Sequence, residues 1–252
     1  MIESRSIDMP IPESFRFLSN FQFGIKNTEI MRERCEFCSI PETKGTELFR
    51  KMYGKDQKLN IPNLPQNFTA MQDLVPIAEK GGHVLLMPNK VGKGHDISLA
   101  TVNDQKQLEF ATNVAVGELK KIFPENPIFI FEHGPGFIEG EPIACGGCHL
   151  DHAHGHILLM PKGTRLESIK KGIEKNLAQI GWNNPASRAE KSDEIFANIY
   201  NVTGINPYLH VGMISPEENV TSFTYVQKLE SEYVESQSLR RVIADVVYSE
   251  KS

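Results

Sequence analysis

Residues 152–161 read His-Ala-His-Gly-His-Ile-Leu-Leu-Met-Pro, and the fold prediction starts from this stretch. An alternation that ends in apolar residues and a proline is typical of a β-strand, here His152–Met160. Because alternate residues of a strand share a face, His152, His154 and His156 are expected to project from the same side of a sheet. Each imidazole has two ring nitrogens that need partners, so three of them in alternation indicate a functional site.

The expected strand geometry limits what the three histidines can do together. At about 3.3 Å per residue, the backbones of His152 and His156 lie about 13 Å apart. One metal ion with ligand bonds of about 2.1 Å is therefore not expected to bind all three rings, although it could bind a pair or a single ring. Two plain interpretations stay open: a metal site that uses a pair, or core histidines bonded to backbone groups. We favour separate tasks along one substrate, in which the middle ring attacks phosphorus and forms a covalent phosphoramidate.

Three segments resemble the histidine triad (HIT) superfamily, in its longer bacterial-type form. Residues 151–158 are similar to the His-x-His-x-His signature and the apolar residues that follow it. Residues 73–77 (Asp-Leu-Val-Pro-Ile) and 82–88 (Gly-His-Val-Leu-Leu-Met-Pro) resemble the Asp-x-x-Pro and Gly-His-x-Leu-x-x-Pro blocks. Residues 129–134 (Phe-Ile-Phe-Glu-His-Gly) precede a glycine-rich loop, as in some bacterial members. The blocks follow the family's order and, with the segment before them, cover roughly residues 35–163.

The resemblance implies nucleotidyl chemistry at the α-phosphate of a nucleotide or dinucleoside polyphosphate, by a hydrolase or a transferase. It assigns attack on phosphorus to His154, through a covalent nucleotidyl-histidine, and support of the departing group to His156. Uridylyltransferases of the superfamily tend to carry glutamine at the third triad position, whereas a histidine can donate a proton, which favours hydrolysis. Two alternatives stay open. One is a dinucleoside-polyphosphate phosphorylase or nucleotidyltransferase with a non-water acceptor, and the other is a zinc-supported nucleotide-binding module with little turnover.

A metal site is indicated by Cys35-Glu36-Phe37-Cys38, because two thiolates at this spacing can share one zinc ion. In zinc-bearing members of the family two histidines join such a pair, and the matching positions are His95 and His152. The resemblance thus implies a structural, four-coordinate Zn²⁺ on Cys35, Cys38, His95 and His152. There are two alternatives. Cys145 and Cys148 could join Cys35 and Cys38 in a Cys₄ zinc site, or the four cysteines could be two pairs of free thiols.

Several further residues are candidates for contact with the substrate. Residues 134–148 contain five glycines, and the backbone N–H groups of Gly146 and Gly147 could approach phosphate oxygens, although a flexible connection is as plausible from glycine content. The resemblance adds His149, which stands where the family usually has a small hydroxyl residue, and the Glu132-His133 pair of the third block. An arginine in the C-terminal segment, Arg241, could bind phosphate bidentately or lie on a solvated basic helix face. Asp73 and His83 match family positions, and we expect His83 to be structural.

Composition restricts the class of partner. The 252-residue chain is 40% apolar and carries a formal net charge of −5, so it has no global field that would gather a nucleic acid polymer. A small-molecule nucleotide bound in a local pocket is the expected partner. No run approaches the ~18 apolar residues of a membrane helix, and the N-terminal sequence lacks the order of a signal peptide, so a cytoplasmic location is expected. The family commonly forms homodimers, so a dimer is one expected state.

The predicted fold class is α+β, a HIT-like antiparallel sheet packed with helices, plus a C-terminal α/β extension. We expect an N-terminal segment (1–34), a HIT-like catalytic domain (35–180) and an extension that packs on it (181–252). Predicted elements are strands over 67–75, 82–88, Ile128–Phe131, Tyr208–Ile214 and Thr221–Leu229, helices over 103–122, from Thr164 and over 236–247, and irregular segments over 41–66, 134–148 and 181–193.

Overall fold

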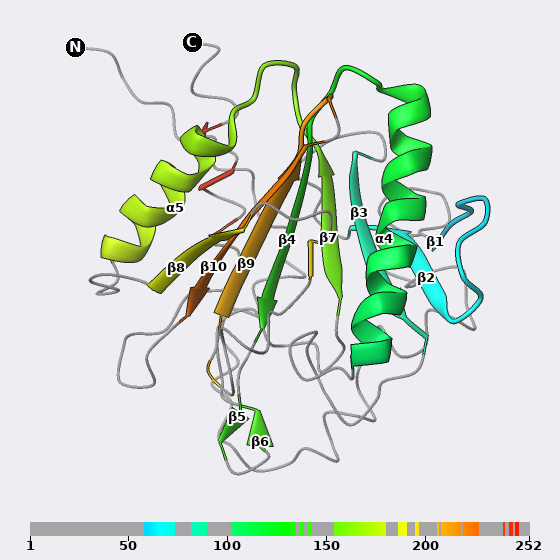
Figure 1. Cartoon of the computed structure of the whole chain (residues 1–252), viewed down its shortest axis with the longest axis horizontal. Helices are drawn as coiled ribbons and strands as arrows, with labels where there is room; N and C mark the ends of the chain where they lie inside the picture. The colour runs from blue at the N-terminus through cyan, green and yellow to red at the C-terminus, as the bar shows by residue number, and fades with distance from the viewer. Residues whose placement is uncertain are drawn as a thin grey trace, which may run out of the picture.

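The computed structural model of the chain (Figure 1) describes residues 58–73, 82–89, 102–134, 137–138, 141–142, 154–179, 186–190, 195–196, 206, 208–217, 219–226, 239, 242–243 and 245–246. Within these residues, eight strands form one sheet in the order β1-β2-β3-β7-β4-β9-β10-β8, and every pair of neighbours is antiparallel. The strands are β1 (Lys58–Leu59), β2 (Phe68–Gln72), β3 (His83–Pro88), β4 (Ile128–Gly134), β7 (Gly155–Leu159), β8 (Ala186–Glu190), β9 (Tyr208–Ile214) and β10 (Val220–Val226).

The strand that carries the triad sequence, β7, lies inside the sheet between β3 and β4. The register places His156 opposite Leu85 on one side and opposite Phe131 on the other. Both neighbouring strands are almost wholly buried. Backbone pairing on both edges therefore fixes the position of the His156 backbone relative to two other strands.

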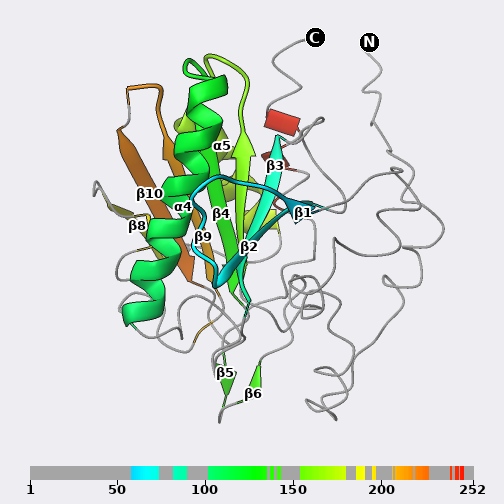
Figure 2. The ribbon, with the colours of Figure 1, turned by 90° about the vertical axis from the view of Figure 1, so that its right-hand side faces the viewer.

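Two helices cover opposite faces of the sheet (Figure 2). Helix α4 (Val102–Ile122) packs through Leu108, Ala111 and Ala115 in a cluster that also holds Ile128, Ile130 and Ile157. Helix α5 (Leu166–Gln179) packs through Leu166, Ile169, Ile173 and Leu177 in a second cluster with Phe129, Phe131 and Leu158. The alternation along β4 explains the division, because its even-numbered side chains enter the first cluster and its odd-numbered side chains the second.

The long C-terminal part of the chain contributes to the same sheet. Strand β9 pairs with β4 along seven positions, from Ile128 opposite Ile214 to Gly134 opposite Tyr208. Three buried residues near the C-terminus, Leu239, Val242 and Ile243, belong to the α5 cluster. The α4 cluster also holds Tyr208 and Ile214. The segments predicted as catalytic domain and as extension therefore share one sheet and both of its cores.

The predicted antiparallel sheet with packed helices is confirmed for the described residues, with small shifts at the element ends. Helix α4 and strand β9 lie within one residue of the predicted bounds. The strand predicted from His152 begins at Gly155, which leaves His154 immediately before it, and residues 151–153 lie outside the described part of the chain. The helix predicted over 236–247 has helical residues at 239, 242–243 and 245–246.

The predicted irregular segments contain strands, and these predictions are wrong in part. The polar segment 181–193 includes β8, which pairs with β10 from Ser222 opposite Glu190 to Val226 opposite Ala186. An edge strand needs backbone pairing on one side only, so its sequence can lack apolar alternation. The segment 134–148 contains the hairpin of β5 (Phe137–Ile138) and β6 (Glu141–Pro142), and 41–66 contains β1.

The helices of the described chain include none with the length and apolar character needed to cross a bilayer.

Gly134 at the end of β4 should tolerate no side chain, because a Cβ there would overlap the ring of Tyr208. Tyr208 is fully buried and lies opposite Gly134 in the neighbouring strand, so its ring has little room to move. Gly134→Ala should lower the free energy of unfolding by about 1–3 kcal/mol, the usual penalty for overpacking, as measured by urea denaturation.

The matched control is Gly117→Ala. Gly117 is exposed on α4, and a Cβ at this position would meet nothing within 4 Å. This change should leave stability equal or raise it by up to ~1 kcal/mol, because alanine favours a helix over glycine. Equal effects of the two substitutions would contradict the role of the Tyr208 contact.

Candidate active site

His154 and His156 lie side by side at the start of β7. Their ring centroids are 4.9 Å apart in an edge-on arrangement, so both side chains occupy the same face of the sheet. His154 is half-buried, whereas His156 is only 7% exposed. The predicted common face is thus confirmed for these two members of the triad. The half-buried ring is the one that the sequence assigns to attack on the substrate.

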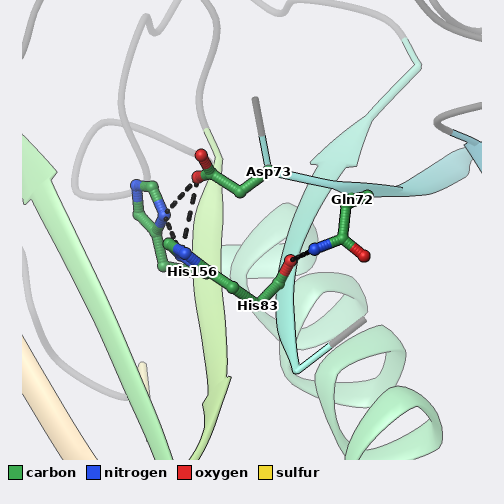
Figure 3. A network of polar contacts seen from close by, with 4 residues as sticks. All are labelled: Gln72, Asp73, His83 and His156. Atoms are coloured by element: carbon green, nitrogen blue, oxygen red, sulfur yellow. Dashed lines mark hydrogen bonds and ion pairs between the residues drawn. The ribbon is translucent and has the colours of Figure 1, made fainter. Parts of the chain in front are cut away.

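The ring of His156 is held on two sides. It stacks on the ring of Phe131 from the neighbouring strand, with centroids 4.1 Å apart and an interplanar angle of 5°. Its Nδ1 atom lies 3.0 Å from Nε2 of His83, at hydrogen-bond distance. One of these two nitrogens donates a proton and the other accepts it, so the contact also selects the tautomer of His156. His156 consequently has one ring orientation, with Nδ1 turned toward His83 (Figure 3).

Asp73 completes a buried cluster with His83 and His156 (Figure 3). Its Oδ2 atom lies 3.5 Å from Nε2 of His83 and 3.4 Å from Nδ1 of His156. The backbone N–H of Asp73 donates a hydrogen bond to the carbonyl oxygen of His83 at 3.1 Å, and the Gln72 amide donates to the same oxygen at 3.3 Å. Asp73 directly follows β2, His83 is the first residue of β3, and His156 lies on β7; each side chain is nearly inaccessible to solvent.

From the sequence we expected His83 to be structural, and the structure shows in addition that it contacts His156 of the triad directly. The Gly-His block of the sequence singled out His83, but it did not show which residue this ring contacts. The contact runs diagonally between neighbouring strands, because His83 lies opposite Leu158, two residues from His156. Only the strand register shows that these rings meet.

His133 lies on β4, on the same face as Phe131 and two residues beyond it. Because Phe131 is opposite His156 in the antiparallel register, His133 is level with His154. Burial, and then the nearby His154, lower the pKa of His133 from 6.5 to about 4. Within the described residues, its buried Nε2 atom has no hydrogen-bond partner. At neutral pH, His133 is therefore an uncharged imidazole next to His154.

Glu132 occupies the opposite face of β4. Its carboxylate accepts a hydrogen bond of 2.7 Å from the hydroxyl of Tyr208, and Tyr208 belongs to the α4 cluster. Glu132 is 3% exposed. Of the Glu132-His133 pair predicted to bind substrate, the structure thus brings only His133 to the face of the triad histidines.

The remaining predicted site residues lie outside the described part of the chain. They are the metal candidates Cys35, Cys38, His95, His152, Cys145 and Cys148, and the substrate-binding candidates Gly146, Gly147, His149 and Arg241. Their roles stay predictions from the sequence.

Comparison with known proteins gives similarity in three-dimensional structure alone. No family model and no curated protein sequence matches the chain. The structure is similar to yeast Ap4A phosphorylase Apa2 in complex with AMP, with a TM-score of 0.37 and 10% identity over 71% of this chain and 64% of that chain. The chain therefore spans about 64% of the length of the yeast protein. It is also similar to a GalT-like protein from Arabidopsis thaliana, with a TM-score of 0.43 and 12% identity over 79% of this chain and 91% of that chain.

The low pKa of His133 should make the protein less stable in mild acid. The unfolded chain binds a proton at this residue near pH 6.5, whereas the folded chain does so only near pH 4, so stability present above pH 6.5 is lost as the pH falls toward 4. The buried His210, whose pKa burial also lowers to about 4, adds a second such group. His133→Asn should reduce the slope of unfolding free energy against pH in this window by up to about 1.4 kcal/mol per pH unit.

Urea denaturation at a series of pH values measures this slope. His210 remains in the variant and serves as the internal reference for a buried histidine. An unchanged slope in His133→Asn would show that His133 is as easily protonated in the folded protein as in the unfolded chain.

Proposed function

We propose that the chain is a nucleotidyl hydrolase or transferase that acts at the α-phosphate of a nucleotide or dinucleoside polyphosphate. The resemblance of its sequence to the histidine triad superfamily motivates the reaction class. The observation that carries the proposal is the pair of adjacent rings, His154 and His156, on one face of the central strand. A nucleophile and a proton donor must both reach one phosphorus centre, and this spacing suits that requirement.

In the first step, a ring nitrogen of His154 attacks the α-phosphorus. A phosphorus–nitrogen bond forms, the bond from phosphorus to the leaving group breaks, and the electron pair departs with that group. In the second step, water or another acceptor attacks phosphorus and releases His154. Attack requires a neutral imidazole on His154, because its ring nitrogen must offer an unprotonated electron pair to phosphorus.

His156 supplies a proton to the departing group. Its Nδ1 is engaged with His83, which leaves Nε2 as the nitrogen that can face the substrate. If Nδ1 accepts a hydrogen bond from His83, the proton of His156 resides on Nε2, which is the tautomer needed for donation. The stack on Phe131 keeps the ring in place while the proton moves. His83 and Phe131 thus act as positioning residues.

A structural zinc ion held by Cys35, Cys38, His95 and His152 is part of the proposal. Two thiolates with two imidazoles form a donor set that zinc favours in closed, four-coordinate sites. Such an ion would contribute folding energy and anchor His152, two residues before the nucleophile. His149, Gly146, Gly147 and Arg241 are the remaining proposed contacts to the phosphates.

Replacement of the nucleophile provides the first test of this mechanism. His154→Ala should abolish turnover while nucleotide binding stays measurable by calorimetry, because the change removes the attacking atom from a half-buried position without touching the core. Mass spectrometry of the native protein mixed with a nucleotide panel should detect a covalent adduct on His154. Residual activity within about tenfold of the native enzyme, roughly 1.4 kcal/mol of barrier, would exclude a covalent role.

A second test compares leaving groups in His156→Gln. Glutamine keeps a polar side chain of similar reach, but its amide group is too weak an acid to donate a proton to the leaving group. The variant should lose far more activity on alkyl or amine leaving groups than on an activated phenol, which departs with little proton assistance. Equal losses on both substrates would mean that His156 only positions the phosphate. Increased transfer to added phosphate or sugar phosphate would favour a transferase over a hydrolase.

A further inference from the structure

Three potential metal ligands converge in the buried cluster of Asp73, His83 and His156. The atoms that face one another are Oδ2 of Asp73, Nε2 of His83 and Nδ1 of His156, and all lie within 4.8 Å of one another. Their separations are 3.0 Å between the two nitrogens, and 3.4 and 3.5 Å from the oxygen to each nitrogen. The three atoms therefore form a nearly regular triangle.

The size of this triangle also suits an ion. Both oxygen–nitrogen distances exceed the 2.7–3.2 Å of ordinary N–H···O bonds, and they are nearly equal, so the carboxylate does not select one ring as its partner. A circle through three points at these separations has a radius of about 1.9 Å. Zinc bonds to histidine nitrogen and carboxylate oxygen measure about 2.0–2.2 Å, so an ion slightly above the plane of the triangle would reach all three atoms.

We propose that Asp73, His83 and His156 bind a divalent transition-metal ion of the zinc type. Two imidazoles and one carboxylate suit zinc, iron, cobalt or nickel, whereas magnesium and calcium prefer oxygen ligands throughout. Three protein ligands leave a coordination position for water or substrate, as in catalytic rather than structural zinc sites. The ion would replace the hydrogen bond between His83 and His156, so His156 would keep its proton on Nε2. It is separate from the zinc proposed at Cys35 and Cys38, which would have a thiolate donor set.

The surroundings of the cluster preorganise the ligands. The backbone bond from Asp73 to the carbonyl oxygen of His83 joins the two ends of the β2–β3 connection, and the Gln72 amide supports the same oxygen. The stack on Phe131 orients His156 from the other side. Side chains locked in this way hold the spacing that a metal needs.

Cobalt binding to the metal-free, full-length protein tests the proposal without any nucleotide. Co²⁺ bound to thiolates gives an intense charge-transfer band in the near ultraviolet, whereas Co²⁺ on nitrogen and oxygen ligands gives only weak visible bands. Asp73→Asn and His83→Gln should each lower the affinity for the Co²⁺ ion that shows no thiolate band by more than about a hundredfold. This exceeds the 10–100-fold loss typical of an outer-shell partner. Any thiolate band should stay unchanged in these two variants.

Glu109→Gln is the matched control, since this partly buried carboxylate contacts the backbone N–H groups of Ile195 and Phe196 at 2.9 Å, away from the cluster. It should bind Co²⁺ like the native protein, and so should His154→Ala. Circular dichroism confirms that each variant is folded. In the native protein, Co²⁺ or Zn²⁺ should also raise the melting temperature. In Cys35→Ser the rise should be smaller but still present, because the ion at Asp73, His83 and His156 still binds.

The proposal is overturned if the native protein binds no Co²⁺ outside thiolate ligation, or if Asp73→Asn and His83→Gln retain native affinity for that ion. Either result would leave the cluster as a hydrogen-bonded relay. Because no readout depends on turnover, these outcomes are independent of the tests on His154 and on the leaving group.

Discussion

The position of β7 between β3 and β4 is the constraint on which the candidate site depends. Pairing on both edges sets His156 opposite Leu85 and Phe131, and this register brings His83 and His133 to the same region. A shift of one residue on either side would turn the imidazoles to the opposite face, because side chains alternate along a strand. The functional groups are thus positioned by main-chain hydrogen bonds, and the side-chain contacts refine ring orientation and tautomer.

The two faces of the sheet also bury different polar groups. On the α4 face, Glu132 and Tyr208 form a buried hydrogen-bonded pair, and His210 is bonded to Thr224 and to the carbonyl oxygen of Ile195. On the opposite face, His133 has a buried nitrogen without such a bond among the described residues. Satisfied polar groups stabilise a core, whereas an unsatisfied one near reactive groups is characteristic of a binding site.

Local sequence patterns predicted most of the fold and part of the site. The apolar stripe of α4 and the alternation of Tyr208–Ile214 were sufficient for those elements, because helix and strand periods are local properties. The strand β8 was missed because its pairing with β10, and not its own composition, stabilises it. The meeting of Asp73, His83 and His156 was missed for a related reason. It depends on the register between strands that are about seventy residues apart in the chain, as the separation of 73 between His83 and His156 shows.

The shared sheet has a practical consequence for anyone who divides this chain into fragments. A fragment that stops at residue 180 would lose β9 and expose the long edge of β4, where seven residues pair with Tyr208–Ile214 in the intact protein. Six of these seven β4 residues are buried, so the exposed edge would be both apolar and rich in unpaired N–H and C=O groups. Such an edge is a template for intermolecular β-pairing. Truncated preparations are therefore expected to aggregate, and expression designs should retain the chain through β10.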